Sequence, residues 1–514
     1  MSVLQNHKIY TASLQVDFEG LEEGLGLQDS LGLFFYEKIK PALEKVFDRH
    51  GNPNETIVLD KLELDCGNLS YSNWEEEFLQ KILVQLEENL KLPQFGKKEI
   101  VPVEKKAEEV FTHFLEKGYF PWNSPFSSPR ELEDSVVLEM SFLENLKKIL
   151  IKSPASFQRL FGSFSEDFIS RIIIAWSQKL NSQESDLVKY LNRSRNTALN
   201  KILIRTLELT FSDPDPASSG QFLKILINQC SQENLSALAE YFGQELVRDR
   251  KLLGAFTALF TEVSNPGFQK KKMILWKKIL RIDPEIILKL KNSLPELDFQ
   301  ILTEATHNGI NLAEEGAEMG FSESLSGLEK ITNKEEMGQE IEIESEFSGE
   351  IFVENAGLVL LHPFLTGLFS NLQLTENGKF VAEYDQGLAA RVLQFLVYGE
   401  NELTENFYPL NKILCRMGIS QFLGEGLEIT ESSKTECEEL LQAVIGHWSV
   451  LKNTSIGGLR ETFLQRNGKI SRVEKGWKLQ VERKTVDVLL AKLPWGMGIV
   501  KLPWMEDMMF VEWE

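Results

Sequence analysis

Alternation of apolar and polar residues predicts two strands near the beginning of the chain. In residues 7–20, apolar side chains occupy every second position from Leu14 to Phe18. This period of two is typical of a strand with one buried face. The alternation returns in residues 57–65, which end at Gly67. We expect both segments to contribute strands to one small domain.

A period of three to four predicts helices after each of these strands. Residues 28–49 place their apolar side chains on one broad helical face, with Asp29 or Ser30 as the N-cap. Pro41 lacks the N–H group that a helix interior needs, so it predicts a kink or two shorter helices. A further helix is expected from about Trp74 to Leu90. Residues 1–90 are therefore predicted to form a small βαβα module.

The pattern of apolar residues in the middle of the chain predicts helical hairpins. Residues 91–106 are charged and contain prolines, so we assign them to a linker. Residues 107–310 show three loose copies of a helix–break–helix unit, broken at Ser153–Pro154, at 231–234 and at Asp283–Pro284. A capping residue followed by proline is a signal for the start of a helix. Units of this kind bury their apolar faces by stacking on one another.

A second linker is predicted in residues 311–350. This stretch contains twelve glutamates and two lysines, with several glycines and few aromatic residues. Such a composition cannot bury enough apolar surface to fold on its own. We expect a solvated connector, which is far more common than a metal-binding acidic patch.

Residues 351–514 are predicted to form a mixed C-terminal domain. It opens with a strand or turn and a buried apolar segment that breaks at Pro363. Helices are expected over 387–398, 411–417 and 437–451, followed by a short helix capped by Thr454 or Ser455. The whole chain is thus expected to be of the α+β class and predominantly α.

The period changes to two at Trp477–Glu482, which predicts a β-rich tail completed by Val486–Leu490 and two copies of Lys-Leu-Pro-Trp. Proline disfavours a helical residue before it, so each Leu-Pro pair should be extended. Indole rings carry a large apolar area and one donor, and are expected to dock into protein. A carbohydrate platform and a lipid-interface belt are alternatives, but packing in a core or a subunit interface is favoured. The expected interaction residues are Leu493, Pro494, Trp495, Leu502, Pro503, Trp504 and Trp513.

Composition limits the class of partner. A chain of 514 residues is expected to contain two to four domains. Its net charge of −22 disfavours nucleic acid, because phosphate binding needs a basic surface. No run of 18 apolar residues predicts a membrane span, and the first residues do not resemble a secretory signal. The cysteines, Cys66, Cys230, Cys415 and Cys437, are widely spaced and are expected to be free thiols in a reducing cytoplasm.

No pattern in the sequence predicts catalysis, a cofactor or a metal. Phosphate-binding glycine loops, the H-E-x-x-H and C-x-x-C metal motifs and the G-x-S-x-G elbow are absent. His362 and His447 lie among apolar residues, where a satisfied core histidine is the more common outcome. Asp60 and Asp65, five residues apart on a strand, should point to opposite faces. We therefore expect a protein that is not an enzyme, without catalytic, cofactor-binding or metal-binding residues.

Four segments, in this order along the chain, carry a resemblance to a known family. The sequence resembles the tape-measure family of bacterial contractile injection systems, which are phage-tail-like particles. The N-terminal segment alone would be a weak signal, whereas the C-terminal one is specific. The matching segments are Asp60–Gly67, Asn355–Phe364, Leu459–Gly468 and Asp487–Trp495 with Leu502–Met505.

The resemblance implies a structural and assembly role, with inner-tube, cap or baseplate proteins as partners. Such a component would help set or seed the length of the inner tube, and would act in the bacterial cytoplasm or in the assembled particle. A single helix of this length would span roughly 770 Å, at about 1.5 Å per residue. Strands at both ends, prolines and the acidic connector argue against one continuous helix. Two alternatives stay open, namely a compact tube-end adaptor or assembly chaperone and, as a remote third reading, a cryptic cell-wall hydrolase.

Overall fold

A computed structural model gives the arrangement of most of the chain. The chain divides into two compact units, residues 1–137 together with 346–514, and residues 138–345. The five-part division expected from the sequence is finer, and its boundaries stay predictions. Most of the expected acidic connector lies outside the described residues. The structure describes residues 7–10, 12–17, 30–52, 54–91, 98–194, 196–212, 221–261, 266–283, 286, 288, 349–399, 404–424 and 427–513.

The N-terminal part of the first unit contains the two expected helices. Residues 30–50 form one helical run, in which a π-helical turn, η1 (Phe35–Ile39), precedes α2 (Lys40–His50). Pro41 stands at the start of α2, where its missing N–H group costs least. Helix α3 (Trp74–Lys91) follows a single 3-10 turn, η2 (Tyr71–Asn73). The predicted break at the proline is thus a π-turn within one helical run.

The strands of this part differ from the prediction. Strand β1 (Glu55–Leu59) pairs antiparallel with β2 (Lys98–Pro102), which lies in the stretch that we assigned to a linker. Residues 12–17, part of the predicted strand 7–20, have no ladder partner among the described residues. Residues 61–66, which follow β1, belong to none of the described ladders. The predicted strand 57–65 therefore overlaps an observed strand only at residues 57–59, and the other predicted strand does not appear among the described strands.

The second unit is built from short helices, as expected. In the first hairpin, Ser153 accepts a hydrogen bond from the N–H of Ser156, and Pro154 is the first residue of the next helix. Ser231 caps the second hairpin in the same way, at 3.3 Å from the N–H of Asn234. The third hairpin is described only up to Asp283. The helices before and within this unit are α4 (Val103–Lys117), α5 (Pro129–Ser135), α6 (Met140–Lys152), α7 (Pro154–Ser163), α8 (Glu166–Ser177), α9 (Ser182–Asn192), α10 (Thr197–Ser212), α11 (Gln221–Gln229), α12 (Asn234–Glu245), α13 (Arg250–Thr261) and α14 (Pro266–Ile282).

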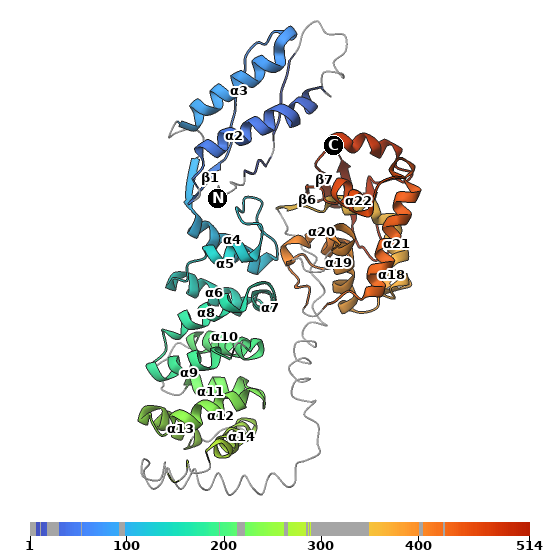
Figure 1. Cartoon of the computed structure of the whole chain (residues 1–514). Coiled ribbons are helices and arrows are strands. Elements are labelled where there is room, and N and C mark those ends of the chain that lie inside the picture. Colours follow the sequence, from blue (N-terminus) through green and yellow to red (C-terminus); the bar gives the residue numbers. More distant parts are fainter. Residues whose placement is uncertain are drawn as a thin grey trace. The chain divides into compact units, whose positions relative to one another are not determined.

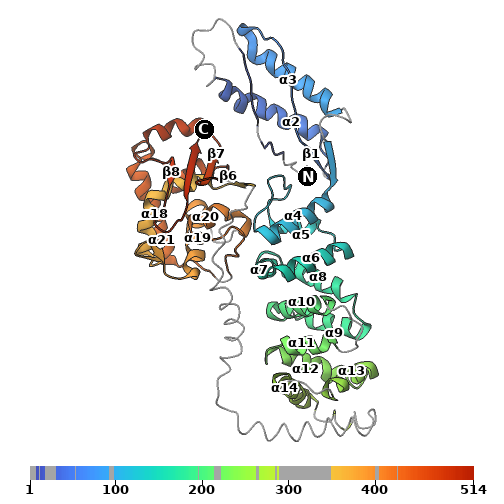
Figure 2. The same cartoon turned by 180° about the vertical axis from the view of Figure 1, so that it is seen from behind.

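Each helix of this unit buries one apolar stripe against its neighbours. Helix α8 packs on α9 and α10, α10 packs on α11, and α12 packs on α14. Figures 1 and 2 show the resulting stack from opposite sides. Large side chains such as Trp176 and Trp276 are completely enclosed between layers. This arrangement agrees with the prediction of stacked helical hairpins.

The C-terminal part of the first unit combines helices with a five-stranded sheet. Residues 356–361, predicted as a buried apolar segment, form a fully buried 3-10 helix. Pro363 then starts the next helix instead of breaking the segment. The elements are β3 (Glu350–Val353), η3 (Ala356–Leu361), α18 (His362–Asn371), β4 (Thr375–Glu376), β5 (Lys379–Phe380), α19 (Glu383–Tyr398), η4 (Glu405–Phe407), α20 (Pro409–Leu414), α21 (Glu431–His447), η5 (Ser449–Leu451), α22 (Ile456–Leu459), η6 (Arg460–Leu464), β6 (Gly468–Val473), β7 (Gly476–Val481), η7 (Thr485–Lys492), β8 (Ile499–Val500) and β9 (Met508–Trp513).

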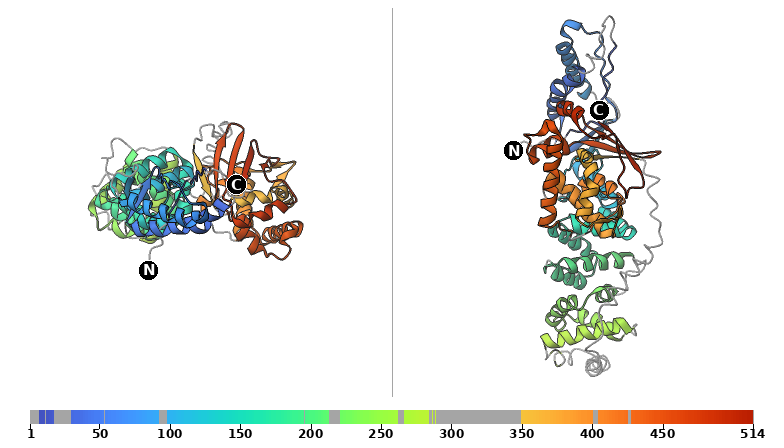
Figure 3. Two further views of the ribbon diagram at one scale, coloured as in Figure 1. Left: turned by 90° about the horizontal axis from the view of Figure 1, so that it is seen from above. Right: turned by 90° about the vertical axis from the view of Figure 1, so that its right-hand side faces the viewer.

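The sheet has the strand order β3-β6-β7-β9-β8. All neighbouring pairs are antiparallel except β7 and β9, which run parallel with Leu479 opposite Val511. Figure 3 shows these strands side by side next to the helices of the domain. One face of the sheet buries Ile351, Ile470 and Leu479 in the main apolar core. The sheet and the surrounding helices thus share one core.

The tail contributes less strand than predicted. Residues 486–490 lie in the 3-10 helix η7, where Asp487 accepts a hydrogen bond at 2.7 Å from the N–H of Lys484. This local bond satisfies an N–H group at the start of a helical turn, so it competes with an extended conformation. Strands β8 and β9 do come from the tail. Within the described residues, none of the helices is long and apolar enough to cross a bilayer.

Candidate interaction site in the tryptophan-rich tail

The second Lys-Leu-Pro-Trp repeat is embedded in the core of its own domain. The side chain of Trp504 is 3% exposed, and its indole N–H donates to the carbonyl of Leu414 at 2.8 Å. Its ring stacks on Phe369 with a centroid distance of 5.3 Å. Leu502 is buried beside it, and Pro503 is exposed. The predicted interaction residues of this repeat therefore contribute mainly to the packing of the domain.

The first repeat lies closer to the surface. The indole N–H of Trp495 donates to the carbonyl of Leu360 at 3.0 Å, and its ring meets Phe364 edge-on at 5.1 Å. The ring remains partly exposed, as does Leu493, and Pro494 is exposed. This end of the tail is thus fixed in position while its outer side stays accessible. Its expected contact with another protein stays a prediction.

Trp513 belongs to a buried charged group. Its indole N–H donates to Asp487 at 3.0 Å, and the guanidinium of Arg466 lies 5.6 Å from the centre of its ring. Arg466 also donates to Asp487, and the two side chains are 0% and 5% exposed. Burial lowers the pKa of Arg466, while the negative charge of Asp487 opposes this shift. The pair holds the beginning of η7 against the last strand.

Three of the four family-like segments meet at one place, which we call the motif node. We define it as residues 355–357, 463–468, Asp487 and Trp513. Within it, the N–H of Ala356 donates to the carbonyl of Arg466 at 2.9 Å. A Cβ atom on Gly468 would come within 2.5 Å of the Cβ atom of Ala356, so only glycine fits there. Segments far apart in the sequence are therefore joined by backbone contact that side chains would block.

A buried amide network extends the node to the helices. Asn355 donates to the side-chain oxygen of Asn411 at 2.7 Å, and Asn411 donates to Gln394 at 2.8 Å and to the carbonyl of Ala390 at 2.9 Å. All three amide side chains are fully buried or nearly so. Buried polar groups stabilise a fold only when they find such partners. The network fixes the end of β3 against α19 and α20.

A second buried ion pair supports helix α20. Lys412 donates to Glu405 at 2.5 Å and to the carbonyl of Ile419 at 3.0 Å, and the two charged side chains are almost completely enclosed. Together with Arg466 and Asp487, these charges are engaged in holding segments together. Among the described residues, no three histidine, cysteine or acidic side chains gather as a metal site would require. The arrangement is that of a rigid domain built around its motifs.

Sequence patterns alone predicted no role for five residues of this domain, namely Arg466, Asp487, Asn355, Gln394 and Asn411. Arg466, Asp487 and Asn355 stand within the family-like segments, but their partners were not predicted. A signal was available for Gln394, which is a single amide inside a run of apolar helical residues. A polar side chain at such a position needs a buried partner. The partner itself depends on the tertiary structure.

The N-terminal family-like segment has a separate structural role. Gly67 has a φ angle of +56°, and its N–H donates to the side chain of Asp65 at 2.9 Å. Glycine adopts this left-handed conformation without steric cost. The segment therefore ends in a tight turn that leads toward helix α3.

Comparison with known proteins agrees with these motifs. The chain matches the model of the contractile injection system tape measure protein family over residues 6–513. Neither the curated proteins nor the solved structures include a significant match. The family match covers all four motif segments and nearly the whole chain. The protein therefore belongs to the contractile injection system tape measure protein family.

Proposed function

We propose that this chain is a folded assembly component that helps set or seed the inner tube of a contractile injection particle. Its C-terminal domain would dock onto inner-tube, cap or baseplate proteins. The observation that carries this proposal is the motif node, because three of the family-like segments meet there and hold this domain together. A rigid domain with an accessible tail segment is suited to binding another protein.

The lengths of the helices favour seeding over measurement by one extended rod. The longest uninterrupted α-helix in the described part of the chain is α3, with 18 residues, and the helical run of residues 30–50, which includes a π-turn, is only slightly longer. At about 1.5 Å per residue α3 spans roughly 27 Å. The helices of residues 138–283 bury their apolar faces against one another, and an extended rod would expose those faces. A ruler that uses this region would first have to unfold it.

Particle length tests the proposal. Removing or duplicating the hairpin of α11 and α12 in the gene changes the helical stack by one unit. A seeding component predicts particles of unchanged length in electron micrographs, while a ruler predicts a shift in proportion to the change. Deleting the whole gene should leave particles absent or of irregular length. Uniform, functional particles of normal length from that strain would contradict the assembly role.

Introducing a charged residue tests whether the accessible end of the tail binds another protein. Pro494 is exposed next to Trp495, so Pro494→Glu should place a charge in the interface without disturbing the core. We expect fewer assembled particles and an unchanged melting temperature. Val381 is 62% exposed and lies outside the tail, so Val381→Glu is the matched control. Equal particle yields from both variants would argue against this surface.

A compact tube-end adaptor or assembly chaperone is the second candidate. It is supported by the same short, packed helices, which need not change during assembly. A chaperone would be missing from purified particles, whereas a seed or adaptor would remain in them at a fixed copy number. Quantitative mass spectrometry of particles distinguishes these outcomes. The hydrolase alternative gains no support, because the buried charges of the domain are used in structural pairs.

A further inference from the structure

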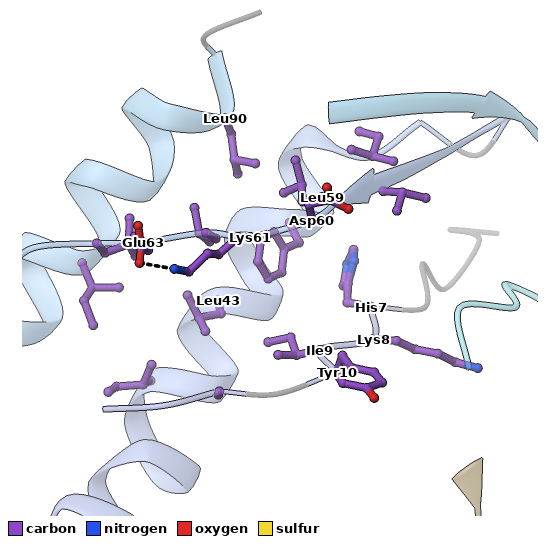
Figure 4. A pocket seen from close by; sticks show the side chains of 18 of the residues that line it. His7, Lys8, Ile9, Tyr10, Leu43, Leu59, Asp60, Lys61, Glu63 and Leu90 are labelled. Carbon is purple, nitrogen blue, oxygen red and sulfur yellow. Dashed lines mark ion pairs between the residues drawn. The ribbon is translucent and has the colours of Figure 1, made fainter. Parts of the chain in front are cut away.

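An open groove of about 2880 Å³ lies beside the helices of the N-terminal module, and residues 122–126, Glu131, Asp134, Ser135 and Glu350 also line it. Its floor is apolar and comes from η1, α2 and α3, including Phe35, Leu43 and Leu90. Residues 55–69 form one wall and residues 7–10 with 12–17 line the other. Figure 4 shows Leu43 at the groove between Lys61 on one side and Ile9 on the other. The groove thus lies between two extended stretches of chain.

The first wall begins with strand β1, and none of the described strands pairs with it on the groove side. Residues 55–59 pair with β2 at one edge only, and residues 61–64 continue without a ladder in the described chain. Leu62 and Leu64 are half-buried on the helices, whereas Lys61 and Glu63 are exposed. This is the alternation of a strand with one buried face. An unpaired strand edge readily accepts another strand.

Side chains of α3 already occupy the far end of this wall. Gln85 accepts from the N–H of Asp65 at 3.1 Å and donates to its carbonyl, Lys81 donates to the carbonyl of Asn68 at 2.9 Å, and Glu77 accepts from Ser70 at 3.2 Å. These three helical residues are four apart and therefore lie on one face of α3. They hold residues 65–70 against α3, through the left-handed turn at Gly67. Because the main-chain N–H and carbonyl of Asp65 are both bonded to Gln85, a further strand could join only the part of the wall before Asp65.

The opposite wall is also extended and exposed. Leu14 and Val16 are each 39% exposed and alternate with polar residues. Apolar side chains at every second position of an exposed segment indicate a surface that a partner covers. A polypeptide strand in the groove could contact both walls and the apolar floor. Its apolar residues would face the helices and its other residues would face solvent.

The charge of the groove selects the partner. Eight carboxylate side chains line it, against two lysines, Lys8 and Lys61. Burial lowers the pKa of Lys8, and the negative charge of Glu354 opposes this shift. A second copy of this chain, with a net charge of −22, would be repelled. A strand whose outward residues are lysine or arginine fits both the shape and the charge.

We propose that this groove binds an extended, basic segment of another protein, which pairs as a strand with residues 57–64. The pairing would turn the two-stranded β1–β2 ribbon into a larger sheet that covers the helices. This inference concerns the groove and does not depend on how the tryptophan-rich tail acts in tube assembly.

Binding of synthetic peptides to the full-length protein tests the proposal. Eight residues span about 26 Å as a strand, which matches residues 57–64. The probe is a fluorescent octapeptide in which lysine alternates with valine or isoleucine. One control replaces every lysine with glutamate. The other carries N-methyl groups on alternate residues, which keep the charge and side chains but prevent a complete ladder.

We expect saturable binding of the basic peptide, and at least about tenfold weaker binding of both controls. The variant with both Glu63→Lys and Asp17→Lys, one on each wall, should bind the basic peptide about tenfold more weakly or worse. Glu76→Lys on the exposed side of α3, outside the groove, is the matched control and should leave binding unchanged. Circular dichroism checks that each variant is folded. Bound peptide should also slow alkylation of Cys66, whose side chain lines the groove.

Three outcomes would overturn the proposal. Equal binding of the N-methylated peptide would mean that only charge attracts it. Equal binding of the acidic peptide, or no saturable binding, would mean that the groove does not select a basic strand. Concentration-dependent dimers that protect Cys66 in the absence of peptide would assign the groove to a second copy of this chain.

Discussion

The backbone of Phe463 occupies the space that a side chain at position 357 would need. A Cβ atom on Gly357 would lie 1.7 Å from the carbonyl oxygen of Phe463 and 2.8 Å from the Cα atom of Leu464. The obstacle is backbone and not a flexible side chain. Gly357 and Phe463 are more than a hundred positions apart in the sequence, and they can lie this close only because Gly357 has no side chain.

Replacing Gly357 with alanine should strongly destabilise the C-terminal domain. Overpacking costs about 1–3 kcal/mol when side chains can shift, and a clash with fixed backbone belongs at or above the upper end. Gly367 in α18 has nothing within 4 Å of an added Cβ atom. Gly367→Ala should therefore stabilise the same domain by about 0.5–1 kcal/mol. Urea unfolding of both variants gives the comparison, and similar stabilities would show that the segments can separate at little cost.

Breaking the buried pair of Arg466 and Asp487 should be costly from either side. Arg466→Met leaves a buried carboxylate, and Asp487→Asn leaves a buried guanidinium, so each should lower the free energy of unfolding by about 3–5 kcal/mol. The double variant should lose less than the sum, because neither charge is then left alone. Glu431 is 87% exposed in its pair with Lys434, so Glu431→Gln should change stability by less than about 0.5 kcal/mol. Additive losses in the double variant would indicate that the charges do not interact.

The two tryptophans of the repeat should differ in their effect on stability. Trp504→Ala removes a fully packed ring and should cost about 3–5 kcal/mol. Trp495→Ala should cost clearly less, because part of that ring is already exposed. Denaturant midpoints measure the difference. If the Trp495 variant is equally destabilised, the first repeat is a core element, and its proposed role in binding loses support.

Stability should fall in acid because of His113 in α4. Burial, with smaller contributions from Lys117 and Lys106, lowers the pKa of His113 from 6.5 to about 4. The unfolded chain then binds a proton in a pH range in which the folded chain does not. The contribution of neutral His113 to the free energy of unfolding is thus fully present above pH 6.5. It is lost as the pH falls toward 4, by at most about 1.4 kcal/mol per pH unit.

His113→Phe should remove this part of the pH dependence. The phenylalanine ring can keep the contact with Tyr119, whose ring centre lies 5.0 Å from that of His113. The difference in stability between the variant and the natural chain should therefore widen in favour of the variant as the pH falls from 7 to 5. Chemical denaturation at several pH values measures it. Parallel curves for the two proteins would show that the histidine is protonated equally in both states.

Local signals allowed most of the helices to be predicted. Ser153 and Pro154 carry a cap and a first-turn residue within two positions, and both act as expected in the structure. Strand β2 was missed because its sequence is charged and ends in proline, and only its pairing with β1 makes it a strand. Residues 12–17 show the reverse case, since their alternation is clear but no strand pairs with them among the described residues. The period of apolar residues indicates whether a segment is helical or extended, whereas the pairing of strands depends on segments that are distant in the sequence.

The same limit applies to the tail. Its composition indicated that the indole rings would dock, but it did not indicate where. Trp495 donates to a residue 135 positions earlier, and Trp504 to one 90 positions earlier. The acceptors are backbone carbonyls of Leu360 and Leu414, which carry no mark in the sequence. Only the folded domain shows that one repeat is enclosed and the other accessible.

Strand β9 lies between β7 and β8 in the sheet. Both partner strands, β7 and β8, are therefore synthesised before β9. The domain cannot close until residue 513 has emerged, and long-range pairing of this kind is slow to form. The complete sheet can therefore form only after β9 has been translated. A nascent chain that stops earlier would lack part of the domain that we propose to dock onto the particle.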